Sequence, residues 1–141
     1  MSLGLCYGLY AGYAVAAVRG ELDITSSPDV ASAIGSLAKR RRVVIVELSG
    51  LEFIDCGGLG VLLRVQRAAR LGGGDVLLAA PAAHVLRLLS LTGLLEAFSV
   101  HASADAAVAS IAGSLVAVAS PRYEPAAEAG SLASALSGAS G

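Results

Sequence analysis

A nearly continuous run of β-branched and aliphatic residues near the middle of the chain most constrains its fold. The run is Val43-Val44-Ile45-Val46-Glu47-Leu48, and it lacks the alternation of apolar and polar residues typical of a strand with one wet face. Such a strand is covered on both faces, as the inner strands of layered α/β sheets are. Segments with helical spacing of apolar residues lie on either side of it, at 28–42 and 57–71. Alternation of helix and strand predicts an α/β fold.

The first 18 residues carry no charge and predict a β-hairpin with a turn at Tyr10-Ala11-Gly12. The glycines among them have the spacing of packed membrane helices, but glycines and tyrosines dilute the stretch too much for a membrane span. We expect the apolar hairpin to be covered by homodimerisation or by the C-terminal segment. The alternation places Leu3, Leu5, Tyr7 and Leu9 on one face, and Tyr13, Val15 and Ala17 on another.

The elements after the hairpin alternate, so we expect a mixed β-sheet with about four helices, mainly packed on one face. Residues 1–113 form the predicted domain, with 8–113 best supported, and residues 114–141 are a helix end and a flexible tail rich in Ala, Ser and Gly. The first predicted helix is capped by Ser26 or Ser27, has Pro28 at its first position and closes with Lys39–Arg42, and the strand 43–48 follows it. A second helix runs from near Gly57 to Leu71 and precedes a strand at 76–79. A third helix is opened by Pro81 and stopped by Gly93, a strand follows at 98–100, and a last helix capped by Ser103 reaches Leu115.

Composition excludes several classes of protein. The chain is 55% hydrophobic and 15% charged, which excludes a wholly disordered protein. Its net charge of −1 disfavours direct nucleic-acid binding. The basic run Lys39–Arg42 could bind phosphate, but we interpret it as the complement to the negative end of a helix dipole. Two cysteines, Cys6 and Cys56, are too few for a disulfide framework, which favours a reducing, cytoplasmic location.

The sequence carries no catalytic or metal-binding motif that we could identify, so we expect neither an enzyme nor a cofactor. Two histidines, His84 and His101, have no carboxylate nearby in the sequence. Glu47, Glu52 and Asp55 could supply an acid and a base, but nothing in the sequence brings them together.

The segment Leu51–Leu63 is the most informative one for function. A buried strand ends, and Asp55 is placed to cap a helix that starts in a glycine-rich turn. The amides of residues 56–58 would form a small electropositive nest, and glycines at 57 and 58 would let a partner's backbone approach closely. A plain capped helix, with the glycines chosen for tight packing, explains the pattern equally well.

This segment resembles the switch motif of STAS domains, the family of bacterial anti-sigma factor antagonists, whose usual form is Asp-Ser-Ser/Thr-Gly-Leu-Gly before an apolar helix. Here it reads Asp-Cys-Gly-Gly-Leu-Gly, from Asp55 to Gly60. Upstream, Gly20-Glu21-Leu22-Asp23 resembles the family's turn after the hairpin, and Ser27-Pro28 fits the start of its first helix. The likeness covers roughly residues 8–113 and implies the STAS fold.

The resemblance also implies a regulatory role in transcription through partner switching. In that family the antagonist binds an anti-sigma factor with a serine-kinase fold and thereby frees a sigma factor. The kinase phosphorylates the first serine after the motif's aspartate, which weakens binding. Cys56 occupies that position and Gly57 the next, so the usual switch is expected to be absent. The residues implied to contact the partner are Asp23, Asp55, Gly57, Gly58 and Leu59.

Several consequences of Cys56 stay open. The chain could bind its partner constitutively, Cys56 could act as a redox switch, or the same surface could bind something else. Alternative functions are a STAS subunit of a lipid- or membrane-transport assembly and a nucleotide-responsive module that uses the amide nest.

Overall fold

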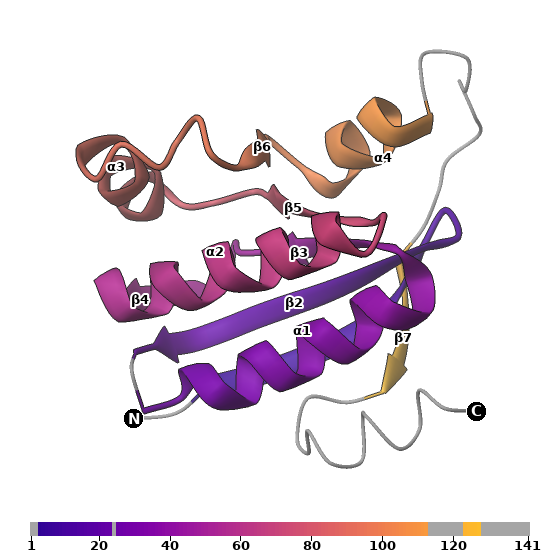
Figure 1. Ribbon diagram of the computed structural model, residues 1–141, viewed down its shortest axis with the longest axis horizontal. Helices are drawn as coiled ribbons and strands as arrows, with labels where there is room; N and C mark the ends of the chain where they lie inside the picture. Colours follow the sequence, from indigo (N-terminus) through magenta and orange to yellow (C-terminus); the bar gives the residue numbers. More distant parts are fainter. Residues whose placement is uncertain (1–2, 24, 113–122, 128–141) are drawn as a thin grey trace.

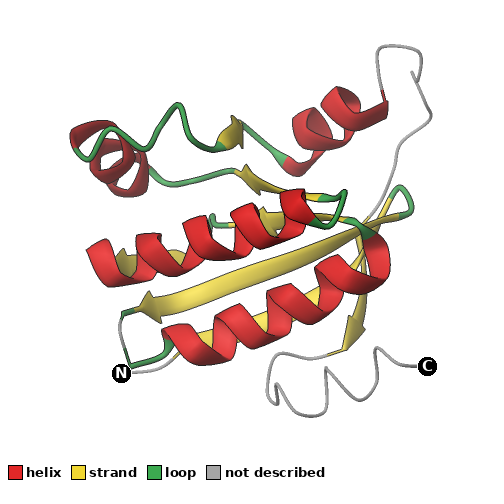
Figure 2. Cartoon of the chain, viewed as in Figure 1, coloured by secondary structure: helices red, strands yellow, loops and turns green. Residues whose placement is uncertain are grey.

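The computed structural model describes residues 3–23, 25–112 and 123–127, which form a single β-sheet flanked by helices (Figures 1 and 2). Within these ranges the sheet has seven strands, in the order β6-β5-β3-β2-β1-β7, with β4 paired to β2 beyond the end of β3. The elements are β1 (Leu3–Tyr10), β2 (Tyr13–Leu22), α1 (Ser27–Arg41), β3 (Val43–Glu47), β4 (Leu51–Ile54), α2 (Cys56–Leu71), β5 (Asp75–Ala79), α3 (Ala83–Leu91), β6 (Ser99–His101), α4 (Ala104–Ala112) and β7 (Tyr123–Ala127).

Strand directions confirm the predicted mixed sheet. The pairs β1–β2 and β1–β7 are antiparallel, whereas β2–β3, β2–β4, β3–β5 and β5–β6 are parallel. Parallel strands need crossover connections, and the helices supply them. The carboxyl ends of β2 and β4 therefore lie at the same end of the sheet, where the candidate site forms.

The central strand β3 is covered on both faces, as its sequence predicts. Val44 and Val46 belong to the larger core, which contains side chains of α1, α2 and α3. Ile45 points the other way, into a smaller core with Val108 of α4. Three helices thus cover one face of the sheet, and α4 covers part of the other. This agrees with the prediction that the helices pack mainly on one face.

The N-terminal hairpin forms with a two-residue turn. Tyr10 pairs with Tyr13, and Ala11 and Gly12 both have positive φ angles, of 54° and 87°. Two successive positive φ angles are the mark of the hairpin turn that suits the twist of paired strands. The turn is tighter than the predicted three residues because Tyr10 stays in the ladder.

Two strands are missing from the predicted order of elements, although the end of a buried strand was expected just before Asp55. In β4 the first and last residues, Leu51 and Ile54, are buried, and the two between them, Glu52 and Phe53, are exposed. This strand therefore shows neither the alternation nor the continuous apolar run by which strands are predicted. The other is β7, five residues that pair with the outer edge of β1 inside the segment predicted to be a tail. The remainder of that segment, at 114–122 and 128–141, lies outside the described residues, and this includes the predicted end of the last helix at Leu115.

The start of α3 differs in detail from the expectation, whereas its end agrees with it. Pro81 lies before the N-cap residue of α3, Ala82, so it precedes the helix and does not open it. Gly93, with a φ of 75°, does end α3, directly after the C-cap Thr92.

Within the described ranges, no helix combines the length and apolar character that a bilayer span requires.

Candidate functional site

The two segments singled out in the sequence meet at one end of the sheet. Leu22 of β2 pairs with Ile54 of β4, and the Asp55 amide donates to the Leu22 carbonyl at 3.4 Å. Asp23 directly follows β2, and Asp55 and Cys56 directly follow β4. The short strand β4 is therefore what brings the upstream turn and the start of α2 together.

Asp23 organises the turn that leads into α1. Its Oδ1 accepts hydrogen bonds from the Thr25 amide at 2.9 Å, the Thr25 hydroxyl at 2.6 Å and the Ser26 amide at 3.1 Å. These donors favour the ionised form and lower the pKa of Asp23, the Thr25 hydroxyl first and the Ser26 amide next. At neutral pH this exposed turn carries a fixed negative charge.

Ser26 is the N-cap residue of α1, but its hydroxyl makes no capping hydrogen bond to the helix. The hydroxyl instead donates to the Glu21 carbonyl at 3.2 Å and accepts from the Asp23 amide at 3.1 Å. The predicted side-chain cap is thus wrong, because the hydroxyl is used to close the turn. Ser26 ties the Asp23 turn to the end of β2.

Asp55 caps α2 as the sequence predicts. Its backbone is extended, and its Oδ1 accepts a hydrogen bond from the Gly58 amide at 2.9 Å. Cys56 is the first residue of the helix and is exposed, with a free thiol. The position that would carry a phosphoacceptor hydroxyl in the resembled motif is thus open to solvent beside a carboxylate.

Gly58 and Leu59 lie beneath the surface. A Cβ on Gly58 would stand 2.7 Å from the Leu22 carbonyl oxygen and 3.0 Å from Ile54 Cγ1. Leu59 is 1% exposed and belongs to the larger core. Both residues hold the start of α2 against β2 and β4, whereas Gly57 is partly exposed.

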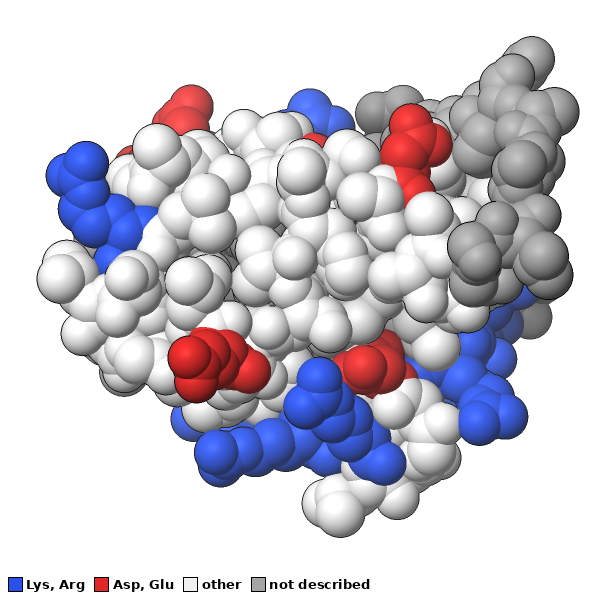
Figure 3. All heavy atoms as spheres, turned by 90° about the horizontal axis from the view of Figure 1, so that it is seen from above, with Lys and Arg blue, Asp and Glu red and all other residues white. Residues whose placement is uncertain are grey.

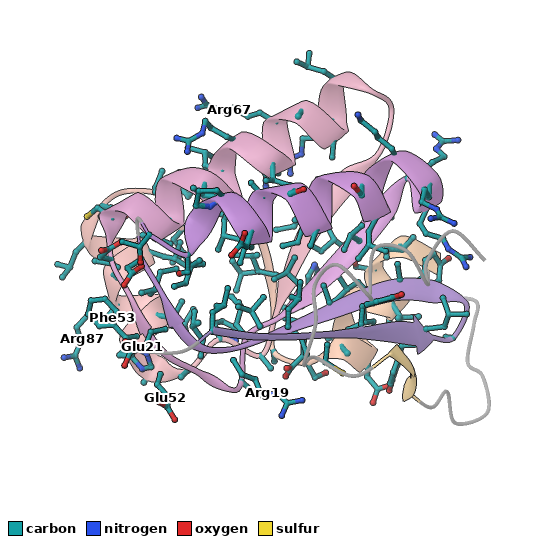
Figure 4. The ribbon with its side chains drawn as sticks, turned by 90° about the horizontal axis from the view of Figure 1, so that it is seen from below. Arg19, Glu21, Glu52, Phe53, Arg67 and Arg87 are labelled. Atoms are coloured by element: carbon teal, nitrogen blue, oxygen red, sulfur yellow. The ribbon has the colours of Figure 1, made fainter. Side chains whose placement is uncertain are left out.

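Sequence reasoning missed one exposed aromatic residue at this end. Phe53 of β4 is 48% exposed and pairs in register with Glu21 of β2, while its neighbour Glu52 is also exposed. Figure 4 shows Phe53, Glu21 and Glu52 side by side on the side of the sheet opposite to the helix that carries Arg67. The sequence did not indicate this, because the strand expected to end before Asp55 was given neither bounds nor faces.

The other candidate side chains do not gather into a site. His84 is exposed on α3, and His101 Nε2 lies 3.5 Å from the Ser110 hydroxyl. Cys6 is buried in β1, and Glu47 ends β3 as expected. Across 3–23, 25–112 and 123–127, no group of three or more His, Cys, Asp or Glu side chains is placed to hold a metal ion.

Comparison with known proteins identifies related chains. The family model described as STAS domain matches residues 10–107. The anti-sigma-B factor antagonist of Bacillus subtilis is 25% identical over 64% of this chain and 84% of its own. The anti-sigma F factor antagonist of Paenibacillus polymyxa is 28% identical over 64% of this chain and 79% of its own. A crystal structure of an anti-sigma factor antagonist from Mycobacterium paratuberculosis superposes with a TM-score of 0.68, at 25% identity, over 79% of this chain and 96% of that one.

Proposed function

The chain belongs to the STAS domain family, and from that premise we propose that it is an anti-sigma factor antagonist. In this role it acts by binding a protein and not by catalysis. Its partner is an anti-sigma factor with a serine-kinase fold, and binding frees a sigma factor for transcription. The similarity to proteins named as antagonists of anti-sigma factors supports this function.

The observation that carries the proposal is the meeting of the Asp23 turn with the Asp55-capped start of α2. The Asp55–Leu22 backbone hydrogen bond joins them, and Cys56 is exposed between a carboxylate and the first amides of the helix. Asp23, Asp55, Cys56 and Gly57 form the proposed contact surface. Gly58 and Leu59 support that surface from below, since both are buried.

Cys56 sets the regulation of this contact. A phosphate at this position would add about −1.5 to −2 charges beside Asp55, which is how phosphorylation disrupts an interface by like-charge repulsion. A thiol is not the normal acceptor of a serine kinase, so the chain stays unmodified in the presence of ATP. We therefore propose binding that is constitutive with respect to phosphorylation.

Phe53 supplies the apolar anchor of the contact. Aromatic side chains that become buried at the centre of an interface contribute most of the binding energy in many complexes. Glu21, Glu52 and Arg87 lie beside Phe53 in Figure 4, so charges of both signs flank the aromatic side chain, which favours a partner surface with complementary charges around an apolar pocket.

The test is affinity capture from the lysate of the source organism, with the wild type and Cys56→Ser as baits, each with and without ATP. We expect both baits to recover a protein with a serine-kinase fold. ATP should release it from the serine bait alone, and that bait should gain the mass of one phosphate. Recovery of transport subunits, or of no kinase-fold protein under any condition, would overturn the proposal.

A matched pair of variants tests the proposed anchor. Phe53→Ser removes the exposed aromatic side chain, and Leu71→Ser removes an apolar side chain that is 90% exposed at the opposite end of α2. Recovery of the kinase-fold protein should fall with Phe53→Ser and stay unchanged with Leu71→Ser. Equal recovery by both variants would remove Phe53 from the interface.

A further inference from the structure

Most of the positive charge of the chain gathers on two neighbouring helices. Seven of its ten basic residues lie on the last turn of α1, on the residue that follows it, and on the second half of α2. In Figure 3, most of the Lys and Arg atoms in view lie along the lower edge, on the side of these helices. We call this surface the basic face, and its members are Lys39, Arg40, Arg41, Arg42, Arg64, Arg67 and Arg70.

Little within the described residues neutralises the basic face. The sole ion pair there joins Arg70 Nε to Asp75 Oδ1 at 2.8 Å. Arg42 donates to the Gly73 carbonyl, and α2 contains no acidic residue along its whole length. An excess of cations on a chain of net charge −1 gives the molecule one strongly positive side.

A groove between α1 and α2 opens onto the basic face. Its volume is about 400 Å³, and Lys39, Arg42 and Arg64 stand among its lining residues. The rest of the lining consists of small or apolar positions, and a Cβ on one of them, Gly35, would meet no atom within 4 Å. The groove is thus an open, apolar trough with a cationic rim.

Leu71 stands at the edge of this groove with nothing packed over it. It is 90% exposed, it follows Arg70, and the next residue, Gly72, lines the groove. A large apolar side chain among cations is the arrangement found on proteins that lie on membrane surfaces, where cations contact headgroups and the apolar side chain enters the headgroup and acyl boundary.

We propose that the basic face docks on a membrane surface of anionic phospholipid. Arginine and lysine bind lipid phosphates, one headgroup occupies the groove, and Leu71 inserts beside it. Clusters of four to eight cations are the size that such surfaces attract. The basic face contains no aromatic residue on which bases of a single-stranded nucleic acid could stack, which disfavours that partner. This interaction goes beyond the proposed function and uses other residues.

The experiment is sedimentation of the full chain with vesicles of equal parts phosphatidylglycerol and phosphatidylcholine, against vesicles of phosphatidylcholine alone. We expect binding to the anionic vesicles only, weakened by salt. The double variant Arg64→Gln/Arg67→Gln should lower the partition coefficient about 30-fold, at roughly fivefold for each charge removed. Leu71→Ser should lower it about tenfold, through loss of apolar insertion.

The chain offers a control of matched charge. Arg19 and Arg87 lie away from the basic face, on the opposite side from Arg67 in Figure 4. Arg19→Gln/Arg87→Gln changes the net charge by the same amount and should leave vesicle binding within about twofold of the wild type. A loss equal to that of Arg64→Gln/Arg67→Gln would overturn the basic face as the site.

Two further outcomes would overturn the lipid surface as the partner. Binding of soluble glycerol phosphate as tight as that of the vesicles would make the groove a site for a small anion. Absence of vesicle binding, together with binding of poly-glutamate, would assign the basic face to an acidic protein. Each readout is independent of the kinase-fold capture, so this proposal and the proposed function can fail separately.

Discussion

At the scale of single residues, Asp55 and Gly58 fix the first turn of α2 in different ways. The Asp55 carboxylate accepts a hydrogen bond from the Gly58 amide. Gly58 lets the helix approach β2 so closely that there is no room for a side chain between the Gly58 Cα and the Leu22 carbonyl oxygen. The exposed Cys56 is thereby held by two neighbours whose roles are structural. Changes at the switch position and at its supports should therefore have separable effects.

We predict that Gly58→Ala lowers the free energy of unfolding by about 1–3 kcal/mol. The new methyl group would stand 2.7 Å from the Leu22 carbonyl oxygen, and a well-packed site yields only at such a cost. Gly35→Ala is the matched control, since its Cβ meets no atom within 4 Å, and alanine stabilises a helix interior by roughly 0.5–1 kcal/mol relative to glycine. Urea unfolding of both variants checks the prediction, and equal effects of the same sign would contradict it.

The Asp23 turn should weaken in acid. The pKa of Asp23 is lowered in the folded chain by the Thr25 hydroxyl and the Ser26 amide, so ionised Asp23 stabilises the fold above its unfolded pKa, about 3.9. That contribution is lost as pH falls through the lowered folded pKa. The stability difference between the wild type and Asp23→Asn should therefore shrink below about pH 4. An Asp23 carboxyl NMR titration with a midpoint at or above the unfolded value would refute this.

At the scale of elements, a buried amide links α2 to the connection between α3 and β6. Gln66 is 1% exposed, and its Nε2 donates to the Ala97 carbonyl at 3.1 Å. We predict that Gln66→Leu, which keeps the volume and removes the donor, lowers the free energy of unfolding by about 1–2 kcal/mol. The neighbouring exposed position supplies the control, where Arg67→Leu should change stability by less than about 0.5 kcal/mol. Thermal unfolding distinguishes the two, and a Gln66→Leu variant as stable as the wild type would show that the hydrogen bond contributes nothing.

The order of elements could be predicted because long segments carry one clear period. The run at 43–48 and the helical stripes at 28–42 and 57–71 determine strand, helix and layer. The bounds of β4 and β7 could not be predicted, because these segments are strands through pairing with a neighbouring strand and neither carries a period of its own. The short strand β6, by contrast, was expected at 98–100. Since β4 positions Phe53, the candidate site was recognised at Asp23 and Asp55 but its exposed aromatic residue was not.

At the scale of the whole molecule, the fold creates charge patterns that the sequence separates. The basic run at 39–42 has a local explanation, since cations complement the end of α1. Only the side-by-side packing of α1 and α2, visible in Figure 1, adds the arginines of α2 to that run. The opposite end of the same helices carries Asp23 and Asp55. The molecule therefore presents an acidic end for one proposed partner and a basic face for another.

The edge of the sheet is the other property that belongs to the whole molecule. The outer edge of β1 is paired with β7, from Tyr7 to Tyr10, by a segment that lies far along the chain. An uncovered edge strand presents unpaired amides and carbonyls to a second copy, and β1 is apolar along most of its length. Cover by the C-terminal segment was one of the two outcomes expected for this hairpin, and homodimerisation was the other.

We predict that deleting residues 113–141 exposes the β1 edge and causes self-association. The molar mass measured by light scattering should then rise with protein concentration, because edge pairing between copies replaces the lost β7 ladder. Deleting only residues 128–141 is the matched control, since it shortens the chain and keeps Tyr123–Ala127, so its mass should not depend on concentration. If the longer deletion also keeps a constant mass and an unchanged melting temperature, β7 does not protect the edge. If both deletions associate alike, the protection comes from residues beyond β7.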